Sequence, residues 1–152
     1  MKNKAVDNFF NSAIYYCNLV ENFNSNQEND KLKNLVISLL DLYSKALLLP
    51  DVEPKNADSY EFDVFLPQIN FEQYDWYWVV FNPYNLNNIE EPVFGSLSDD
   101  ILDIYKDVKE GILLYDQNEQ LEAIWHWKFH FQAHWGRHAV DAIRALHSIN
   151  FN

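Results

Sequence analysis

The sequence predicts an all-α protein: a bundle of four main helices with an irregular, aromatic-rich insert between the second and third helices. Three glycines and five prolines are too few for a turn-rich β-sandwich. Apolar residues recur at helical spacing in four long segments. The length of 152 residues and the 48% hydrophobic content suit a single helical domain, residues 1–152, that buries its own core.

The first two helices are predicted at residues 5–24 and about 29–49. The second is apolar nearly all round, which is typical of a buried helix, and Pro50 and Pro54 follow its end. Cys17 is the only cysteine and lies in the apolar pattern of the first helix. We therefore expect an inert core thiol, with no disulfide and no cysteine-based zinc site within one chain.

The insert, residues 60–95, is the hardest part of the chain to assign. We favour a short helix in FEQYDWYWVVFNPYN, although its β-branched and aromatic content also suits a strand. Such a helix would place on one side Tyr74, Tyr77, Trp78 and Phe81. No other segment shows a clear alternation with period two, so we expect a sheet of at most two short strands.

The third helix is predicted at residues 96–116. Ser96 and Asp99 have capping-box spacing, and acidic residues in the first turn suit the helix dipole. The acidic side chains group on one side: Asp99, Asp100, Asp103, Asp107 and Glu110. We interpret this side as a solvated face, with contact to the last helix as the alternative. DDILD matches the DDxxD motif of isoprenoid synthases, but those enzymes need a longer chain and a second metal-binding segment.

The last helix, from about Glu119 to His147, contains all five histidines. Four of them, His126, His130, His134 and His138, are spaced by four residues and form what we call the histidine ladder. Each step of four turns an α-helix by about 40°, so the ladder stays on one side. The same half carries Glu122, Arg137, Asp141, Arg144 and His147. The apolar half collects Leu121, Ile124, Trp125, Phe129, Trp135, Ala139, Val140, Ile143 and Leu146.

Three interpretations of the histidine ladder stay open. The polar side chains can form structural ion pairs, or Arg137 and Arg144 can bind an anionic ligand or a partner. A metal ion is the third interpretation, with His130, His134 and Asp103 as ligands. The sequence does not favour it, because HWKFH lacks the glutamate of HExxH and four histidines in line span more than about 15 Å. We therefore expect no cofactor.

The short connection between the third and last helices predicts that they are antiparallel neighbours. At least one carboxylate of the third helix should then lie within salt-bridge distance of an imidazole or guanidinium of the last helix. The predicted polar network or ligand-binding site comprises Asp100, Asp103, Asp107, His130, His134, Arg137, His138, Asp141 and Arg144. Nothing in the sequence assigns a catalytic role to any of them.

The net charge of −12 limits the partners. Such a chain repels nucleic acid and anionic membranes, whereas a protein partner or a small anionic ligand is compatible with it. No run of residues approaches the 18 or so apolar residues of a membrane span, so we expect a soluble, cytoplasmic protein. The oligomeric state is left open.

Four stretches, LLDLYSKALLLP, VFNPY, SLSDDILDIYKDVKEGILLYD and FQAHWGRHAVDAIRALH, together resemble an uncharacterised family of small bacterial proteins, a domain of unknown function. The resemblance covers about residues 9 to 148 and implies a mainly helical, cytoplasmic bacterial protein without implying an activity. From the residues we expect a non-enzymatic acidic binding or regulatory module that uses the histidine- and arginine-rich face of the last helix. The alternative is a metal-dependent hydrolase with aspartate and histidine ligands on the last two helices.

Overall fold

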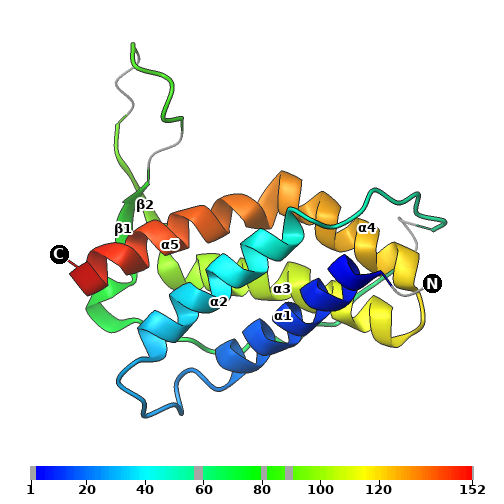
Figure 1. The fold of residues 1–152 in the computed structure, drawn as a ribbon. Coiled ribbons are helices and arrows are strands. Elements are labelled where there is room, and N and C mark those ends of the chain that lie inside the picture. Colours follow the sequence, from blue (N-terminus) through cyan, green and yellow to red (C-terminus); the bar gives the residue numbers. More distant parts are fainter. Residues whose placement is uncertain (1–2, 57–59, 80–81, 88–90, 152) are drawn as a thin grey trace.

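The structure is a computed structural model that describes residues 3–56, 60–79, 82–87 and 91–151. Its helices are α1 (Lys4–Glu21), α2 (Lys31–Ala46), α3 (Leu97–Asp116), α4 (Gln120–His130) and α5 (Gly136–Phe151). A π-helical turn joins α4 to α5, so the last two form one long, bent segment (Figure 1). α1 packs on α2 and α3, and α5 packs on the same two helices, which confirms the predicted bundle of four main helices. None of the described helices is long and apolar enough to cross a membrane.

Aromatic side chains fill the centre of the bundle. The Phe9 ring on α1 lies 5.0 Å from that of Trp127 and 6.3 Å from that of Trp135, measured between ring centroids, and all three side chains are fully buried. Cys17 lies in the same core, where burial raises the pKa of its thiol to about 12. The thiol is therefore protonated at neutral pH, as expected for an inert core cysteine.

The predicted apolar half of the last helix is wrong at several positions. Phe129 and Val140 are exposed, whereas Trp127 and Phe131, which the prediction omitted, are buried. The imidazole side packs against α3, and the buried arc of the helix is shifted toward that side. A helical wheel alone does not locate the edge of the buried arc, because an imidazole suits a solvated surface and a carboxylate-lined interface equally well.

The last helical segment has a second series of residues spaced by four, besides the histidine ladder, and the π-helical turn at Phe131–Trp135 keeps this series on the core side. Its members are Ala123, Trp127, Phe131, Trp135 and Ala139, all of them buried. In an uninterrupted α-helix four such steps would carry the side chains about 160° around the axis. A turn with i→i+5 hydrogen bonds contains more residues, so each residue advances by a smaller angle and the drift is reduced. The same turn keeps the later histidines on the α3 side.

The helix predicted within FEQYDWYWVVFNPYN is wrong. Only Glu72–Tyr74 form a 3₁₀ turn, and β1 (Trp76–Val79) then pairs antiparallel with β2 (Val93–Ser96). The β-branched and aromatic residues of β1 find a partner in VFGS, a strand too short to show periodicity. Phe81, which the prediction placed on that helix, lies outside the described residues. Among the described residues the sheet has two short strands, as predicted.

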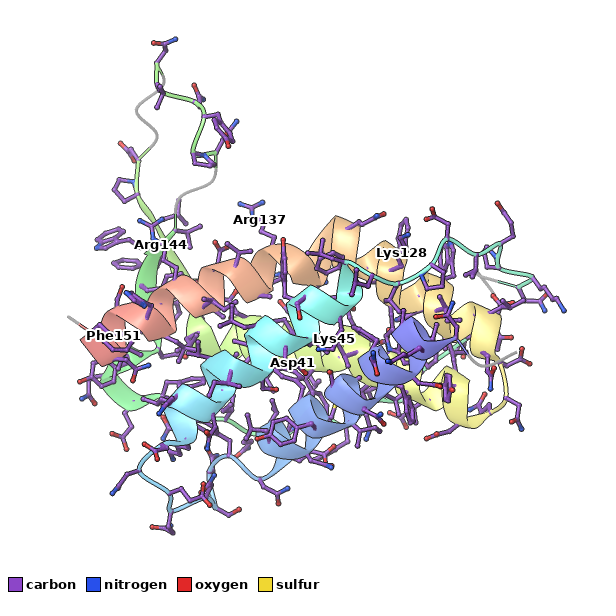
Figure 2. All side chains as sticks on the ribbon, viewed as in Figure 1. Asp41, Lys45, Lys128, Arg137, Arg144 and Phe151 are labelled. Carbon is purple, nitrogen blue, oxygen red and sulfur yellow. The ribbon has the colours of Figure 1, made fainter. Side chains whose placement is uncertain are left out.

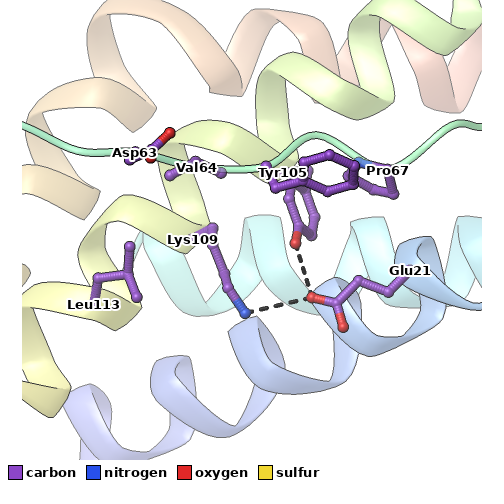
Figure 3. Close-up of a pocket in the computed structure, with 8 residues that line it drawn as sticks. Glu21, Asp63, Val64, Pro67, Tyr105, Lys109 and Leu113 are labelled. Atoms are coloured by element: carbon purple, nitrogen blue, oxygen red, sulfur yellow. Dashed lines mark hydrogen bonds and ion pairs between the residues drawn. The ribbon is translucent and has the colours of Figure 1, made fainter.

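Residues 60–69 form an irregular strap along the bundle rather than a strand. The strap contains three partly buried side chains, Tyr60, Phe62 and Val64, and the residues between them are exposed. This alternation is a period-two signal that the sequence prediction overlooked. The strap covers a cavity of about 400 Å³ against α1 and α3 (Figure 3). Inside it, Glu21 accepts hydrogen bonds from Tyr105 Oη at 2.8 Å and Lys109 Nζ at 3.3 Å, so these polar groups satisfy one another.

The beginning of α3 is fixed to the base of the hairpin. Ser96 caps the helix as predicted, because its Oγ accepts a hydrogen bond from Asp99 N at 3.3 Å. Asp75, just before β1, accepts hydrogen bonds from Ser96 Oγ at 2.9 Å and Ser98 N at 2.8 Å. The hairpin and the acidic helix are therefore positioned relative to each other by one carboxylate.

Gly111 sets the close approach of α3 to α4, and its replacement by alanine tests this packing. An alanine Cβ would lie 2.0 Å from Trp127 Nε1, an atom that donates to Val108 O at 3.0 Å. Alanine gains roughly 0.5–1 kcal/mol of helix propensity over glycine, but overpacking a core costs about 1–3 kcal/mol. We expect Gly111→Ala to lower the free energy of unfolding in urea by about 1–2 kcal/mol. An unchanged or raised stability would contradict the packing described.

Candidate functional site

The acidic side of α3 is largely buried. Asp100, Asp107 and Glu110 are 5%, 6% and 9% exposed, and Asp103 lies between them at intermediate exposure. The positions follow one helical stripe at steps of three and four residues. The interpretation as a solvated face is therefore wrong for the three buried residues, and it holds only for Asp99, which is exposed. Buried carboxylates require partners, because an unpaired buried charge is strongly destabilising.

The partners are two histidines of the last helical segment. His134 Nδ1 lies 2.6 Å from Asp107 Oδ2, and His138 Nδ1 lies 2.6 Å from Asp100 Oδ1. His138 Nε2 also lies 3.5 Å from Asp103 Oδ2. The predicted contact between carboxylates of the third helix and imidazoles of the last is thus confirmed. We call these five side chains, Asp100, Asp103, Asp107, His134 and His138, the seam.

The carboxylates determine where each imidazole of the seam carries its lone pair. A carboxylate is an acceptor, so the Nδ1 atoms of His134 and His138 donate to Asp107 and Asp100. In a neutral imidazole the other nitrogen, Nε2, is then an acceptor. The two Nε2 atoms lie 3.2 Å apart. Two acceptors at this distance repel unless a proton or a cation lies between them.

His138 is the imidazole that the surroundings make easier to protonate. The hydrogen bond to Asp100 raises the pKa of His138, against the opposing effect of burial, and the charges of Asp100 and Asp103 add to the increase. In the absence of a cation, a proton on His138 Nε2 can therefore be donated to His134 Nε2.

The other two members of the histidine ladder lie beyond the seam. His126 is buried, and its Nε2 lies 3.2 Å from Glu110 Oε2 at an angle that makes no hydrogen bond. His130 Nδ1 is 3.9 Å from Asp107 Oδ1. Burial, with the neighbouring His126 as a second cause, lowers the pKa of His130, so this imidazole is neutral at pH 7.

The remaining residues of the predicted network have separate surroundings. Burial raises the pKa of Asp141, and the charge of Asp100 adds to the increase while Arg137 and Arg144 oppose it. Arg144 lines a cavity beside the hairpin, and the structure does not bring it to the seam. Both arginines project from α5 (Figure 2).

Glu122 and His147, which the sequence placed on the polar half, take other roles. Glu122 Oε1 accepts hydrogen bonds from the backbone N–H groups of Lys55 at 2.7 Å and Asn56 at 3.3 Å. It therefore anchors the loop after α2 on α4. His147 is exposed near the C-terminal end of α5, where its ring lies 5.0 Å from that of Phe151.

Tyr77 is a residue of the site that the sequence prediction missed. Its hydroxyl donates to Asp100 Oδ2, the oxygen that His138 does not use. Burial raises the pKa of Tyr77, and the bond to Asp100 raises it further, so the phenol remains a donor. Gly95, the cross-strand partner of Tyr77, leaves room for the tyrosine ring, because a Cβ at Gly95 would lie only 2.7 Å from Tyr77 Cζ. The sequence signal for this site residue is a tyrosine paired with a glycine across a hairpin. It can be used only after the two strands have been recognised.

The seam also contains a group of potential metal ligands. One ligand atom from each of Asp103, His134 and His138 lies within 4.8 Å of the others. The sequence proposed His130 in place of His138, and this choice is not supported by the geometry. The histidine pairs His130/His134 and His134/His138 both have the spacing of four that a shared metal ion requires. The position of Asp103 along α3 decides between them, because Asp103 lies beside His138.

The bond between His138 and Asp100 predicts a pH-dependent stability in the metal-free protein. Because the folded-state pKa of His138 is raised, its contribution is fully present below the unfolded value near 6.5 and is lost as pH rises through the folded value. In EDTA, His138→Gln should lower the free energy of unfolding by about 1 kcal/mol at pH 6, since the His138 side chain is partly exposed, and by less at pH 9. Urea titrations at both pH values check this, with His147→Gln as the control. A loss that is equal at both would contradict it.

The comparisons with known proteins agree with the helical fold. The chain resembles the crystal structure of protein BF1032 from Bacteroides fragilis with a TM-score of 0.72 and 23% sequence identity, over 99% of this chain and 94% of that chain. At this identity the likeness shows the fold alone. No curated protein matches the chain. The model of a family described as a domain of unknown function, DUF5063, matches residues 2–152. The chain therefore belongs to the DUF5063 family, which confirms the resemblance to an uncharacterised family of helical proteins.

Proposed function

We propose that this chain binds one divalent transition-metal ion of the zinc type through Asp103, His134 and His138. The observation that carries the proposal is the convergence of two Nε2 acceptors at 3.2 Å, each on an imidazole held by a carboxylate at Nδ1. Two nitrogens bound to a tetrahedral zinc ion at about 2.0–2.1 Å lie roughly 3.3 Å apart. The separation of 3.5 Å between His138 Nε2 and Asp103 Oδ2 is also close to one edge of such a tetrahedron.

The buried carboxylates support this function from behind the ligands. Asp100 and Asp107 fix the tautomer and the ring orientation of His138 and His134, as carboxylates commonly do for metal-bound histidines. They also raise the basicity of the imidazoles. The polar atoms are thus arranged before an ion arrives, which reduces the entropy lost on binding.

The geometry changes the order of the interpretations that the sequence left open. Metal binding had the least support from the sequence, because HWKFH lacks the glutamate of HExxH and four histidines in a line cannot all reach one ion. The proposed site needs only two of them, with Asp103 of the neighbouring helix as the third ligand. We therefore propose an acidic binding module on the last helix whose ligand is a cation.

The exposed side of the site supports hydrolysis as a second candidate function. Three protein ligands leave one tetrahedral position for water, and zinc lowers the pKa of such water to about 7. The side chains of His134 and Asp103 are each 45% exposed, so the remaining position faces solvent. An exposed site also suits a metal ion that only binds, so an assay must distinguish the two functions.

Metal removal and return test the proposed function. Protein stripped with EDTA should bind one equivalent of Zn²⁺ in a calorimetric titration. At a free zinc concentration 100 times Kd the ion should stabilise the fold by about 2.7 kcal/mol, which corresponds to a rise in Tm of roughly 5–10 °C. Asp103→Asn and His134→Gln should each weaken binding at least about tenfold, and Asp107→Asn should weaken it about 10–100-fold through ring orientation.

The matched control is His147→Gln, an exposed histidine on the same helical segment. Its Kd should equal that of the wild type. If His147→Gln and His134→Gln weaken zinc binding equally, or if the stripped wild type binds no stoichiometric metal, the proposed site is wrong.

An ester assay separates the two functions. Hydrolysis predicts that the zinc-loaded wild type cleaves 4-nitrophenyl acetate or bis(4-nitrophenyl) phosphate faster than the stripped protein, and that Asp103→Asn abolishes the difference. Equal rates for the loaded and stripped wild type would leave metal binding without catalysis of these esters.

A further inference from the structure

A second concave site lies between the hairpin and α5, separate from the proposed metal ligands. It is a cavity of about 480 Å³, within the range of about 300–1,000 Å³ that small-molecule sites occupy. Its walls include Tyr74, Trp76, Tyr77, Trp78, Arg144 and Ile149. β1 lies beside α5 at the base of the hairpin (Figure 1), and the aromatic side chains of β1 and of the turn before it line the cavity together with residues of α5.

The aromatic walls are unusually exposed for side chains of their size. Trp76 is 67% exposed, Trp78 is 59% exposed and Tyr74 is 48% exposed. Trp78 stacks on Phe94 of the neighbouring strand at 4.2 Å between ring centroids, which holds its indole in place. Contiguous apolar surface rimmed by polar groups is typical of a binding site, because leaving it in water is unfavourable. Flat, held rings of this kind favour a flat ligand.

Arg144 gives the cavity a charge opposite to that of the protein as a whole. It is the only charged residue among the described residues that line the cavity, whereas the chain carries a net charge of −12. A competing carboxylate is Asp141, one turn earlier on α5, whose charge Arg144 helps to stabilise. A guanidinium binds a carboxylate through two parallel hydrogen bonds. A ligand with several negative charges would be repelled by the net negative charge of the protein.

We propose that this cavity binds a planar aromatic ring bearing one carboxylate, with the ring against the exposed tryptophans and the carboxylate on Arg144. The inference does not depend on the proposed metal site, since none of the metal ligands lines this cavity. The sequence analysis left open that Arg137 and Arg144 bind an anionic ligand. We assign this role to Arg144, because Arg137 is not among the described residues that line the cavity.

The test compares an aromatic carboxylate with its neutral amide. In EDTA, 1-naphthaleneacetate should bind the wild type with one molecule per chain by calorimetry, at least about tenfold tighter than 1-naphthaleneacetamide. Arg144→Gln should reduce the affinity for the carboxylate to that for the amide and leave the amide affinity unchanged. Asp141→Asn, which removes the competing carboxylate, should tighten binding of the carboxylate.

The matched control is Arg137→Gln, which makes the same charge change two turns earlier on α5. It should leave both affinities at the wild-type value. Trp76→Ala should weaken both ligands, because it removes the shared ring contact. Thermal melts establish that the variants are folded; Trp76, Arg137 and Arg144 are exposed, and Asp141 is partly buried.

Several results would overturn the proposal. Equal affinities for the carboxylate and the amide would remove the role of Arg144, and equal effects of Arg137→Gln and Arg144→Gln would show a general charge effect. No binding of either ligand at 1 mM would exclude this ligand class. A wild type that sediments as a dimer, with Trp76→Ala as a monomer, would show that the aromatic wall is covered by a second copy of the chain. Because all arms use metal-free protein, they succeed or fail independently of zinc binding.

Discussion

Two buried carboxylates constrain how α3 packs on the last helical segment. Asp100 and Asp107 sit in an interface where an unpaired charge would cost several kcal/mol, and each is paired with an imidazole at 2.6 Å. Apolar contacts are non-directional and tolerate a small slide of one helix along another. Short hydrogen bonds do not. The two bonds, seven residues apart on α3, therefore fix both the rotation and the axial position of this helix.

The same bonds that fix the packing also prepare the proposed metal site. By occupying Nδ1 of His134 and His138, the carboxylates direct both Nε2 acceptors to one point. The structural and the metal-binding interpretations of the histidine ladder are thus compatible. One nitrogen of each ring stabilises the helix pair, and the other is available to a ligand. A π-helical turn containing His134 contributes by keeping the four-residue steps on the α3 side, and such turns are frequent at functional sites.

The hairpin connects the two proposed sites without supplying a metal ligand. Asp75 holds the hairpin base on the beginning of α3, and Gly95 leaves room for the ring of Tyr77. Tyr77 donates to Asp100 on the seam and also lines the cavity that contains Arg144. An irregular aromatic insert therefore has a defined place in the fold, because one side chain bridges the acidic helix and the cavity beside α5.

The sequence by itself determined the helices, the Ser96 cap and the antiparallel contact of α3 with the histidine helix, because these depend on local periodicity and on a short connection. Only the tertiary structure decided which imidazoles meet which carboxylates. It replaced His130 with His138 as a potential ligand and showed Asp100 and Asp107 to be buried. The physical reason is that a helical pattern defines a face but not what lies opposite it at the same height. The strand at Trp76–Val79 escaped prediction for the same reason, since its stability comes from a partner fourteen or more residues away.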